Sequence, residues 1–527
     1  MDELPQEVIE RIVLFLPGGL SAEWSVELKD HSISQYAVIS NKFRMAIERS
    51  MFKRLRINND ELEDFAQILT PSRRGFLRFL DYSIVLPSID AAVSHQRYER
   101  PAETEVVSQL FSLHTKNLFD TLSRLDGLRG LNLDLGKACH FSEVTKSHTD
   151  IYGVDEFFEY HHLRSRIDLL TPNALPQLSF ISRLAILDSD RTLTSSAYID
   201  LAARMPRLQD LHFFFIWDEV RYPGLLRKDR CILATTLKLR SEETKTISVA
   251  TLDMNVNYDH GAMHQLLPMP NLIYPSGYDL LGSSLRTWSQ RLNKFDIRGV
   301  FDETLFWPHA LETTSSPPEW ADLKTYYVQL ERHTPSGWWY FMPKGKPKFG
   351  TPPRNPAEDP NDLPLPFTDD PTGGADPFDK RVEDAWDCRK GYAMPEEDFV
   401  TRNVPNEDNM QPLLEGWAKA LLSMPSLRQA TLAFSVEIFN SRSGDENDLC
   451  LDDWEIIYEA PDNFGSFRWE SKIEPEERRN RRLTFHNTSG WRPNKDTMDM
   501  LRRVGEDSYP GTKSVILDVD DWGDILR

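Results

Sequence analysis

The sequence predicts an α/β fold in which a small helical module precedes a series of helix–strand units and a mixed β region. Three observations lead to this prediction. Two amphipathic helical patterns open the chain, the pattern Leu-x-x-Leu-x-Leu recurs after helical segments, and alternating or β-branched stretches follow residue 450. Short strands and returning helices cannot bury their apolar faces alone, so they are expected to stack as parallel strands with helices outside.

The first predicted helix spans residues 5–16. Val8, Ile12 and Leu16 recur four residues apart, which places them on one face of a helix. Pro5 suits the first turn, because its missing N–H would have no partner there in any case. The next three residues after position 16 are Pro-Gly-Gly, which end the helix.

A second helix is predicted to begin after Ser40, whose hydroxyl suits an N-cap. Phe43, Ile47 and Met51 share one of its faces. Both helices could pack into the chain's own core, which is the usual fate of an amphipathic helix.

Taken together, residues 4–56 resemble the F-box in the version found at the N-termini of many filamentous-fungal proteins. The resemblance is carried by Leu4, Pro5, Glu7, Val8, Ile12, Leu16, the stretch from Tyr36 to Ser40, Phe43, Ala46, Ile47, Glu48, Phe52, Arg54 and Leu55. Two features depart from the family pattern: the connection before Ile33 is longer, and Phe43 stands where tryptophan is common.

The F-box docks on a Skp-type adaptor and, through it, on a cullin–RING ubiquitin ligase of the SCF type. The resemblance implies a substrate receptor that is not itself an enzyme, needs no cofactor and holds a protein substrate near the ligase. It implies adaptor contacts by Leu4, Pro5, Val8, Ile12, Leu16, Val38, Ser40 and Phe43. A cluster of basic residues could speed docking on an acidic adaptor or could simply be a solvated face; it comprises Lys42, Arg44, Arg49, Lys53, Arg54 and Arg56.

Composition narrows the class of protein. The chain has 527 residues, with 61 Lys and Arg against 82 Asp and Glu, a formal net charge of -21. This acidic balance disfavours nucleic acid as the main partner. The sequence contains no run of eighteen apolar residues, so no membrane span is predicted. The four cysteines are far apart, which argues against disulfides and zinc and predicts a cytoplasmic or nuclear protein. The sequon at Asn487 is therefore expected to be unused.

A degenerate repeat begins after residue 125, with strand starts expected near residues 131, 184, 211, 250, 295, 325 and 430. The clearest copies follow Leu128, Met205-Pro206 and Met424-Pro425. The spacings are longer and less even than those of regular leucine-rich repeats. They predict a leucine-rich-repeat-like solenoid, with a generic α/β domain of helix–loop–strand units as the alternative.

The predicted organisation has five parts. They are an F-box helical domain (1–57), a helical connector (58–125), the solenoid (126–334), an acidic Pro-rich loop that is partly disordered (335–410), and the last repeat with a β/helix cap that closes the sheet edge (411–527). The loop opens with aromatic residues 338–341 and becomes rich in Pro, Asp and Gly, from which no core can form. A polyproline docking strip is the less favoured interpretation of this loop.

No catalytic motif is present: the sequence has no nucleophile elbow, phosphate loop, dinucleotide turn or zinc helix. His161 and His162 are adjacent, so on a helix their rings diverge and cannot share a metal. No metal site is predicted, and the acidic residues 518, 520 and 521 fit a solvated tail. The least favoured hypothesis is an enzyme whose active site has no recognisable sequence motif.

The favoured function is a substrate receptor, and the main alternative is a leucine-rich-repeat scaffold without any link to ubiquitin. The substrate site is unknown, but outward residues of the strands are the expected binding surface. They are Arg129, Asn132 and Asp134 in the first unit, Gln209, His212 and Phe214 in the third, and Gln429, Thr431 and Ala433 in the last. Phe214 is a weak candidate anchor, because aromatic residues on both faces of its strand also fit core packing.

Overall fold

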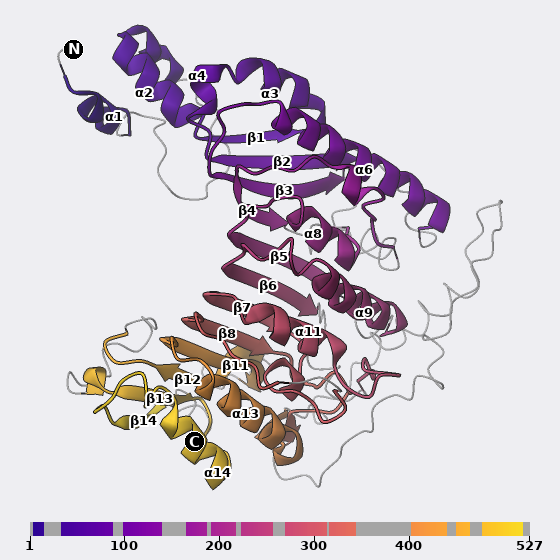
Figure 1. The fold of residues 1–527 in the computed structure, drawn as a ribbon, viewed down its shortest axis with the longest axis vertical. Coiled ribbons are helices and arrows are strands. Elements are labelled where there is room, and N and C mark those ends of the chain that lie inside the picture. Colours follow the sequence, from indigo (N-terminus) through magenta and orange to yellow (C-terminus); the bar gives the residue numbers. More distant parts are fainter. Residues whose placement is uncertain are drawn as a thin grey trace.

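The computed structural model describes residues 4–14, 33–87, 99–139, 165–186, 191–217, 223–256, 269–312, 316–343, 402–439, 449–463 and 477–519. The architecture is mixed α/β, with a large, mostly parallel sheet and helices along one side of it (Figure 1). Within the described residues one large apolar core runs from Ile57 to Val504, and a smaller cluster lies between the first two helices.

Twelve described strands form one sheet, and their order across the sheet is their order along the chain. They are β1 (Arg54–Asn58), β2 (Phe79–Leu86), β3 (Leu131–Cys139), β4 (Ile181–Ile186), β5 (Asp210–Trp217), β6 (Val249–Val256), β7 (Lys294–Gly299), β8 (Thr325–Leu330), β11 (Gln429–Phe439), β12 (Leu449–Glu459), β13 (Arg481–His486) and β14 (Ser514–Val519). Neighbours pair in parallel, except that β12 is antiparallel to both β11 and β13. A separate antiparallel pair joins β9 (Phe341–Pro343) to β10 (Arg402–Pro405).

The α-helices in the described ranges are α1 (Gln6–Leu14), α2 (Asn41–Met51), α3 (Leu62–Ile68), α4 (Pro71–Arg74), α6 (Pro101–Ser123), α8 (Ser195–Ala202), α9 (Pro223–Leu239), α11 (Leu280–Ser289), α13 (Glu407–Leu422) and α14 (Lys495–Arg503). Short 3-10 turns include η1 (Ile33–Val38), η2 (Asn59–Glu61), η4 (Pro172–Ala174), η5 (Glu303–Leu305) and η9 (Glu477–Arg479). None of the helices in the described ranges is long and apolar enough to cross a bilayer.

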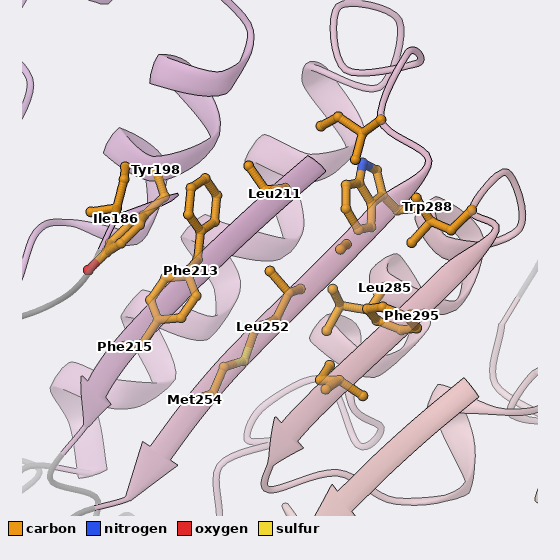
Figure 2. Packing of buried hydrophobic residues seen from close by; sticks show 14 of the residues in the cluster. Ile186, Tyr198, Leu211, Phe213, Phe215, Leu252, Met254, Leu285, Trp288 and Phe295 are labelled. Atoms are coloured by element: carbon orange, nitrogen blue, oxygen red, sulfur yellow. The ribbon is translucent and has the colours of Figure 1, made fainter. Parts of the chain in front are cut away.

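The pleat of the sheet separates apolar from polar side chains. On β5, Leu211, Phe213 and Phe215 are buried, whereas His212 and Phe214 between them are half-buried. The buried side chains of the sheet pack against the helices. Tyr198 of α8 lies edge-on to Phe213 of β5, and Trp288 of α11 lies edge-on to Phe295 of β7 (Figure 2). One face of the sheet therefore supplies the core, and we call the opposite face of β1 to β8 the open face.

Several helix starts are set by side chains that accept backbone N–H groups. Asp279 caps α11 by accepting from the amide of Leu281, and Asn494 caps α14 by accepting from that of Thr497. Pro101 occupies the first turn of α6, where a missing N–H costs nothing. These local signals fix where the helices begin, and the apolar stripe of each then packs on the sheet.

The strand starts expected for the repeat are confirmed, since β3 to β8 and β11 begin at or near the predicted positions. The sheet begins earlier than expected, however. Residues 54–58 form β1, and β2 follows within the predicted helical connector, so both belong to the large sheet. The cause is visible in the alternation of β1: Leu55 and Ile57 face the core while Arg54 and Arg56 are exposed.

The aromatic residues at the start of the predicted surface loop are instead packed. Trp339, Tyr340 and Phe341 are buried, and the Phe341 ring lies edge-on to Phe434 of β11, with 5.2 Å between ring centroids. The prediction of a loop over 335–410 was therefore wrong for 335–343, because these aromatic side chains complete the core at β11 and β12. It was also wrong for 402–410, which form β10 and the first turn of α13. Residues 344–401, which hold the Pro-rich composition, lie outside the described residues.

The C-terminal strands and helix expected from the sequence are confirmed as β12, β13, β14 and α14. They extend the sheet by three strands rather than covering its edge, since β14 pairs with β13 alone among the described residues. One of the alternating stretches after residue 450, at residues 467–469, also predicts a strand, and it lies outside the described residues. Asn487 is buried and its Nδ2 donates to the carbonyl of Asp453 at 3.1 Å, so the sequon is inaccessible in the folded chain.

Candidate functional site

The N-terminal module, formed by α1, η1 and α2, has an apolar centre of its own. Ile9, Val13, Phe43 and Ile47 are at most 3% exposed and contact one another across the two helices. The side chain of Ser40 accepts the amide of Phe43 at 3.3 Å, which confirms the predicted N-cap of α2. The two predicted helices are therefore a packed pair.

Some of the residues predicted to contact an adaptor are exposed on this module. Leu4 is 36%, Val8 41% and Val38 88% exposed. These three exposed aliphatic side chains of one small module are candidate contacts for an apolar partner. Pro5 is also exposed and stands directly before α1, where its carbonyl accepts the amides of Val8 and Ile9.

The prediction was wrong for Phe43, which is buried in the centre of the module and cannot enter a groove on a partner without unfolding α2. Its ring is part of the small apolar cluster that packs α1 against α2. Ile12 is half-buried against the same centre. Leu16 lies outside the described residues.

The basic residues of α2 and β1 are partly neutralised by carboxylates of the same chain. Arg49 pairs with Glu10, and Arg54 donates to Asp81 at 3.1 Å. Lys42 donates to the carbonyl of Leu4 at 2.8 Å, which ties α2 to the start of α1. The positive charge available to a partner at this edge is therefore smaller than the sequence count suggests.

The module is attached to the rest of the chain through α2 and β1. Glu48 pairs with Arg73 of α4 at 3.0 Å, and the Arg73 guanidinium lies 4.5 Å from the centroid of the Phe52 ring. Phe52 and Leu55 in turn pack against the large core. The chain thus passes directly from the helix pair into the first strand of the sheet.

The open face carries a continuous row of aligned residues across the sheet. From β1 to β14 the row is Arg56, Asp81, Asp134, Ala185, His212, Thr251, Asp296, Tyr327, Thr431, Ile457, Thr484 and Leu517. The row is mostly polar and half-buried from β2 to β8, and it becomes buried from β11 to β13. The part of the face accessible to a ligand is therefore the part formed by β1 to β8.

Carboxylates on the open face are shielded from water without being fully paired. Asp134, Asp253 and Asp296 each have a buried Oδ1 atom without a hydrogen-bond partner among the described residues. Burial is the main cause that raises the pKa of each of these three carboxyls. Burial also lowers the pKa of the neighbouring His212, and the positive charge of Arg183 lowers it further.

The guanidinium groups of the open face lie next to carboxylates. Arg183 is 3.4 Å from Asp210, and Arg298 is 3.8 Å from Asp253. Arg54 also reaches toward Asp134, at 3.8 Å. Each of these arginines therefore already lies near a carboxylate, whereas some carboxylate oxygens of the open face have no hydrogen-bond partner among the described residues.

The residues predicted to face outward differ in their exposure to solvent. Arg129 and Gln209 are exposed, and Asn132, Asp134, His212, Phe214 and Gln429 are half-buried. Thr431 and Ala433 were wrongly placed: they are 5% and 0% exposed, because β11 lies in the part of the sheet where both faces are covered. Phe214 lies on the open face, opposite Asp253 of β6. Asp134 was among the residues predicted to face outward, but Asp253 and Asp296 were missed, since in sequence each is a single acid between apolar residues.

A second polar cluster is buried beneath α11. Asp302 accepts the amide and the hydroxyl of Thr304 at 3.0 and 2.6 Å, and Asp279 pairs with Arg230 at 2.8 Å. Burial, and then the nearby charges of Asp279 and Glu303, raise the pKa of Asp302 to about 8. The contacts of this cluster join α9, α11 and η5 in the interior of the chain, so we assign it a structural role.

No group of three or more His, Cys, Asp or Glu side chains in the described ranges is arranged to hold a metal ion. His161 and His162 lie outside those ranges. No protein-family model matches the chain, and no curated protein matches it. The candidate functional sites are therefore the exposed apolar side chains of the N-terminal module and the open face of the sheet.

Proposed function

We propose that the chain is a substrate receptor of an SCF-type cullin–RING ubiquitin ligase. In this role the N-terminal module binds a Skp-type adaptor, and the sheet domain binds a protein substrate. The observation that carries the proposal is the pair of helices with its own closed centre and with Leu4, Val8 and Val38 left exposed. A helix pair that served only to cover the sheet would turn such side chains inward.

The proposed adaptor surface consists of Leu4, Pro5, Val8 and Val38. Phe43 and Ser40 support it from within, since one fills the module and the other caps α2. Aliphatic side chains presented on helices are suited to an apolar groove on a partner. The receptor has no catalytic part in this proposal; it acts by bringing the substrate close to the ligase.

Co-purification with a Skp-type adaptor tests the proposal. The full chain is co-expressed with the adaptor as wild type, as Val8→Glu/Val38→Glu, and as the control Leu239→Glu/Leu311→Glu, which changes two exposed leucines far along the chain. Each buried aliphatic side chain contributes about 1.5–3 kcal/mol, so the first variant is expected to weaken adaptor binding by about 100-fold or more.

The control variant is expected to retain the adaptor, and both variants should melt like the wild type. A Leu4→Ala/Pro5→Ala variant probes the same surface without adding charge. Absence of any adaptor complex with the wild-type chain would leave the scaffold without a ubiquitin link as the better account. Equal adaptor retention by all variants would place the contact elsewhere.

A further inference from the structure

The middle of the open face has more carboxylate than the chain itself compensates. Asp296 on β7 makes no hydrogen bond or ion pair with any residue that the structure describes. Burial raises its pKa, and the more distant charges of Arg298 and Lys294 offset only part of that effect. Asp253 on β6 has Arg298 at 3.8 Å, at the limit of an ion pair. Asp296 is opposite Thr251, two residues before Asp253 on β6, so the two carboxyls are diagonal neighbours on the open face. Burial raises the pKa of Asp253, the charge of Arg298 lowers it, and the charge of Asp296 raises it again. This part of the face would be stabilised by an added positive charge.

The two carboxylates are also prepared for a ligand by their surroundings. Each has one buried oxygen with no partner in the described part of the chain, so water has already been removed from it in the free protein. A cation that reaches the other oxygen does not have to remove that water again. Its attraction to the carboxylates is also stronger than in bulk water, because the local dielectric constant is lower.

An aromatic ring lies beside this charge. Phe214 is directly opposite Asp253 in the parallel pairing of β5 with β6, and both side chains are half-buried on the open face. A long basic side chain can lay its methylene groups or its guanidinium on such a ring while its charged end meets the carboxylates. The combination of ring and carboxylates selects lysine or arginine over a small inorganic cation.

We propose that Phe214, Asp253 and Asp296 form a binding site for a lysine or arginine side chain of a basic, extended segment in a protein partner. The formal net charge of -21 adds long-range attraction for a basic partner. The inference deepens the proposed function, because this partner would be the substrate presented to the ligase. The contact itself does not depend on the adaptor.

The test uses a fluorescein-labelled octapeptide of alternating arginine and alanine, with an octapeptide of alternating glutamate and alanine as the charge-reversed probe. Fluorescence anisotropy at 150 mM salt gives the affinity for the full chain. The Asp253→Asn/Asp296→Asn variant keeps the shape of both side chains and removes their charge. It is expected to bind the basic peptide about tenfold more weakly or worse, the usual loss for a hydrogen bond to a charged group.

The matched control is Asp64→Asn/Asp322→Asn, which removes two negative charges from exposed positions outside the open face. It should bind the basic peptide like the wild type, and the glutamate peptide should bind neither. Asp296→Lys places a cation in the site and should abolish binding. Circular dichroism melting checks that each variant is folded.

Two outcomes would overturn the inference: unchanged affinity of the Asp253→Asn/Asp296→Asn variant, or an equal loss in the control, which would indicate attraction by net charge alone. Adaptor co-purification is measured in parallel. Loss of the adaptor complex with peptide binding intact would refute the ligase role and leave the basic-segment site standing. Retained adaptor with no peptide selectivity would refute the site and leave the ligase role standing.

Discussion

The hydroxyl of Tyr340 donates a 2.8 Å hydrogen bond to the backbone carbonyl of Phe301. This contact ties the segment after β8 to the turn after β7, and Phe341 next to it packs against Phe434 and Trp454. The aromatic stretch at 339–341 is thus part of the core, although it directly precedes a Pro-rich region of the sequence.

The first prediction concerns this stretch. Phe341→Ala is expected to lower the free energy of unfolding by about 3–5 kcal/mol, because it removes a fully buried ring from a close-packed aromatic group. Trp338→Ala, at a side chain that is 40% exposed, should change it by no more than about 0.5 kcal/mol. Urea unfolding followed by tryptophan fluorescence and circular dichroism measures both. Equal effects of the two changes would show that the stretch is not part of the core.

The second prediction concerns pH. Burial raises the pKa of Asp302 to about 8, so between about pH 4 and pH 8 the folded chain holds a proton that the unfolded chain has lost. The stability from this proton is complete below about pH 4 and is lost as pH rises through about 8. Relative to Asp302→Asn, the wild type should lose about 1.4 kcal/mol of unfolding free energy per pH unit within that window.

Urea unfolding at pH 5.5, 6.5 and 7.5 measures this difference. The variant is a suitable reference, because an asparagine oxygen can still accept from the amide and hydroxyl of Thr304. Parallel pH curves for the two proteins would show that Asp302 titrates normally.

The third prediction concerns a glycine in α11. A Cβ atom at Gly282 would lie 2.7 Å from Thr304 Oγ1 and 2.8 Å from Asp279 Oδ2, so Gly282→Ala should cost about 1–3 kcal/mol of unfolding free energy. Gly75→Ala is the control: its backbone is helical and the nearest atom would be 4.0 Å away. The control is expected to be neutral or to stabilise the chain by about 0.4–1 kcal/mol. Thermal melts that rank the two variants in the opposite order would contradict the packing under α11.

The fourth prediction separates the N-terminal module from the sheet. Its centre is a distinct cluster, so Phe43→Ala should increase hydrogen exchange of backbone amides in α1 and α2 but leave β3 to β8 protected. Ser40→Ala, which removes the N-cap, should produce a smaller increase that corresponds to about 1 kcal/mol. Exchange measured by mass spectrometry distinguishes these cases. Loss of protection throughout the sheet would show that the two clusters unfold together.

Strands β3 to β8 and β11 could be predicted because each carries its own signal, a short run of alternating apolar residues. The first strand was missed because Arg54 and Arg56 looked like the basic end of a helix, and only pairing with β2 makes their alternation visible. Burial of Thr431 and Ala433 depends on what covers β11 from elsewhere in the chain, which no local pattern encodes. The aspartates of the open face become a group only through register, since Asp134 and Asp296 are far apart in sequence but lie in one row.

The order of the strands bears on how the chain is made. Each strand from β2 to β8 pairs with the strand that precedes it in the chain, so its partner leaves the ribosome before it does. Such a sheet can grow by addition at one edge, with no need to wait for a distant partner. Nascent chains that end after β5 or β6 are therefore expected to hold a partly formed sheet whose newest edge is the site that a chaperone must protect.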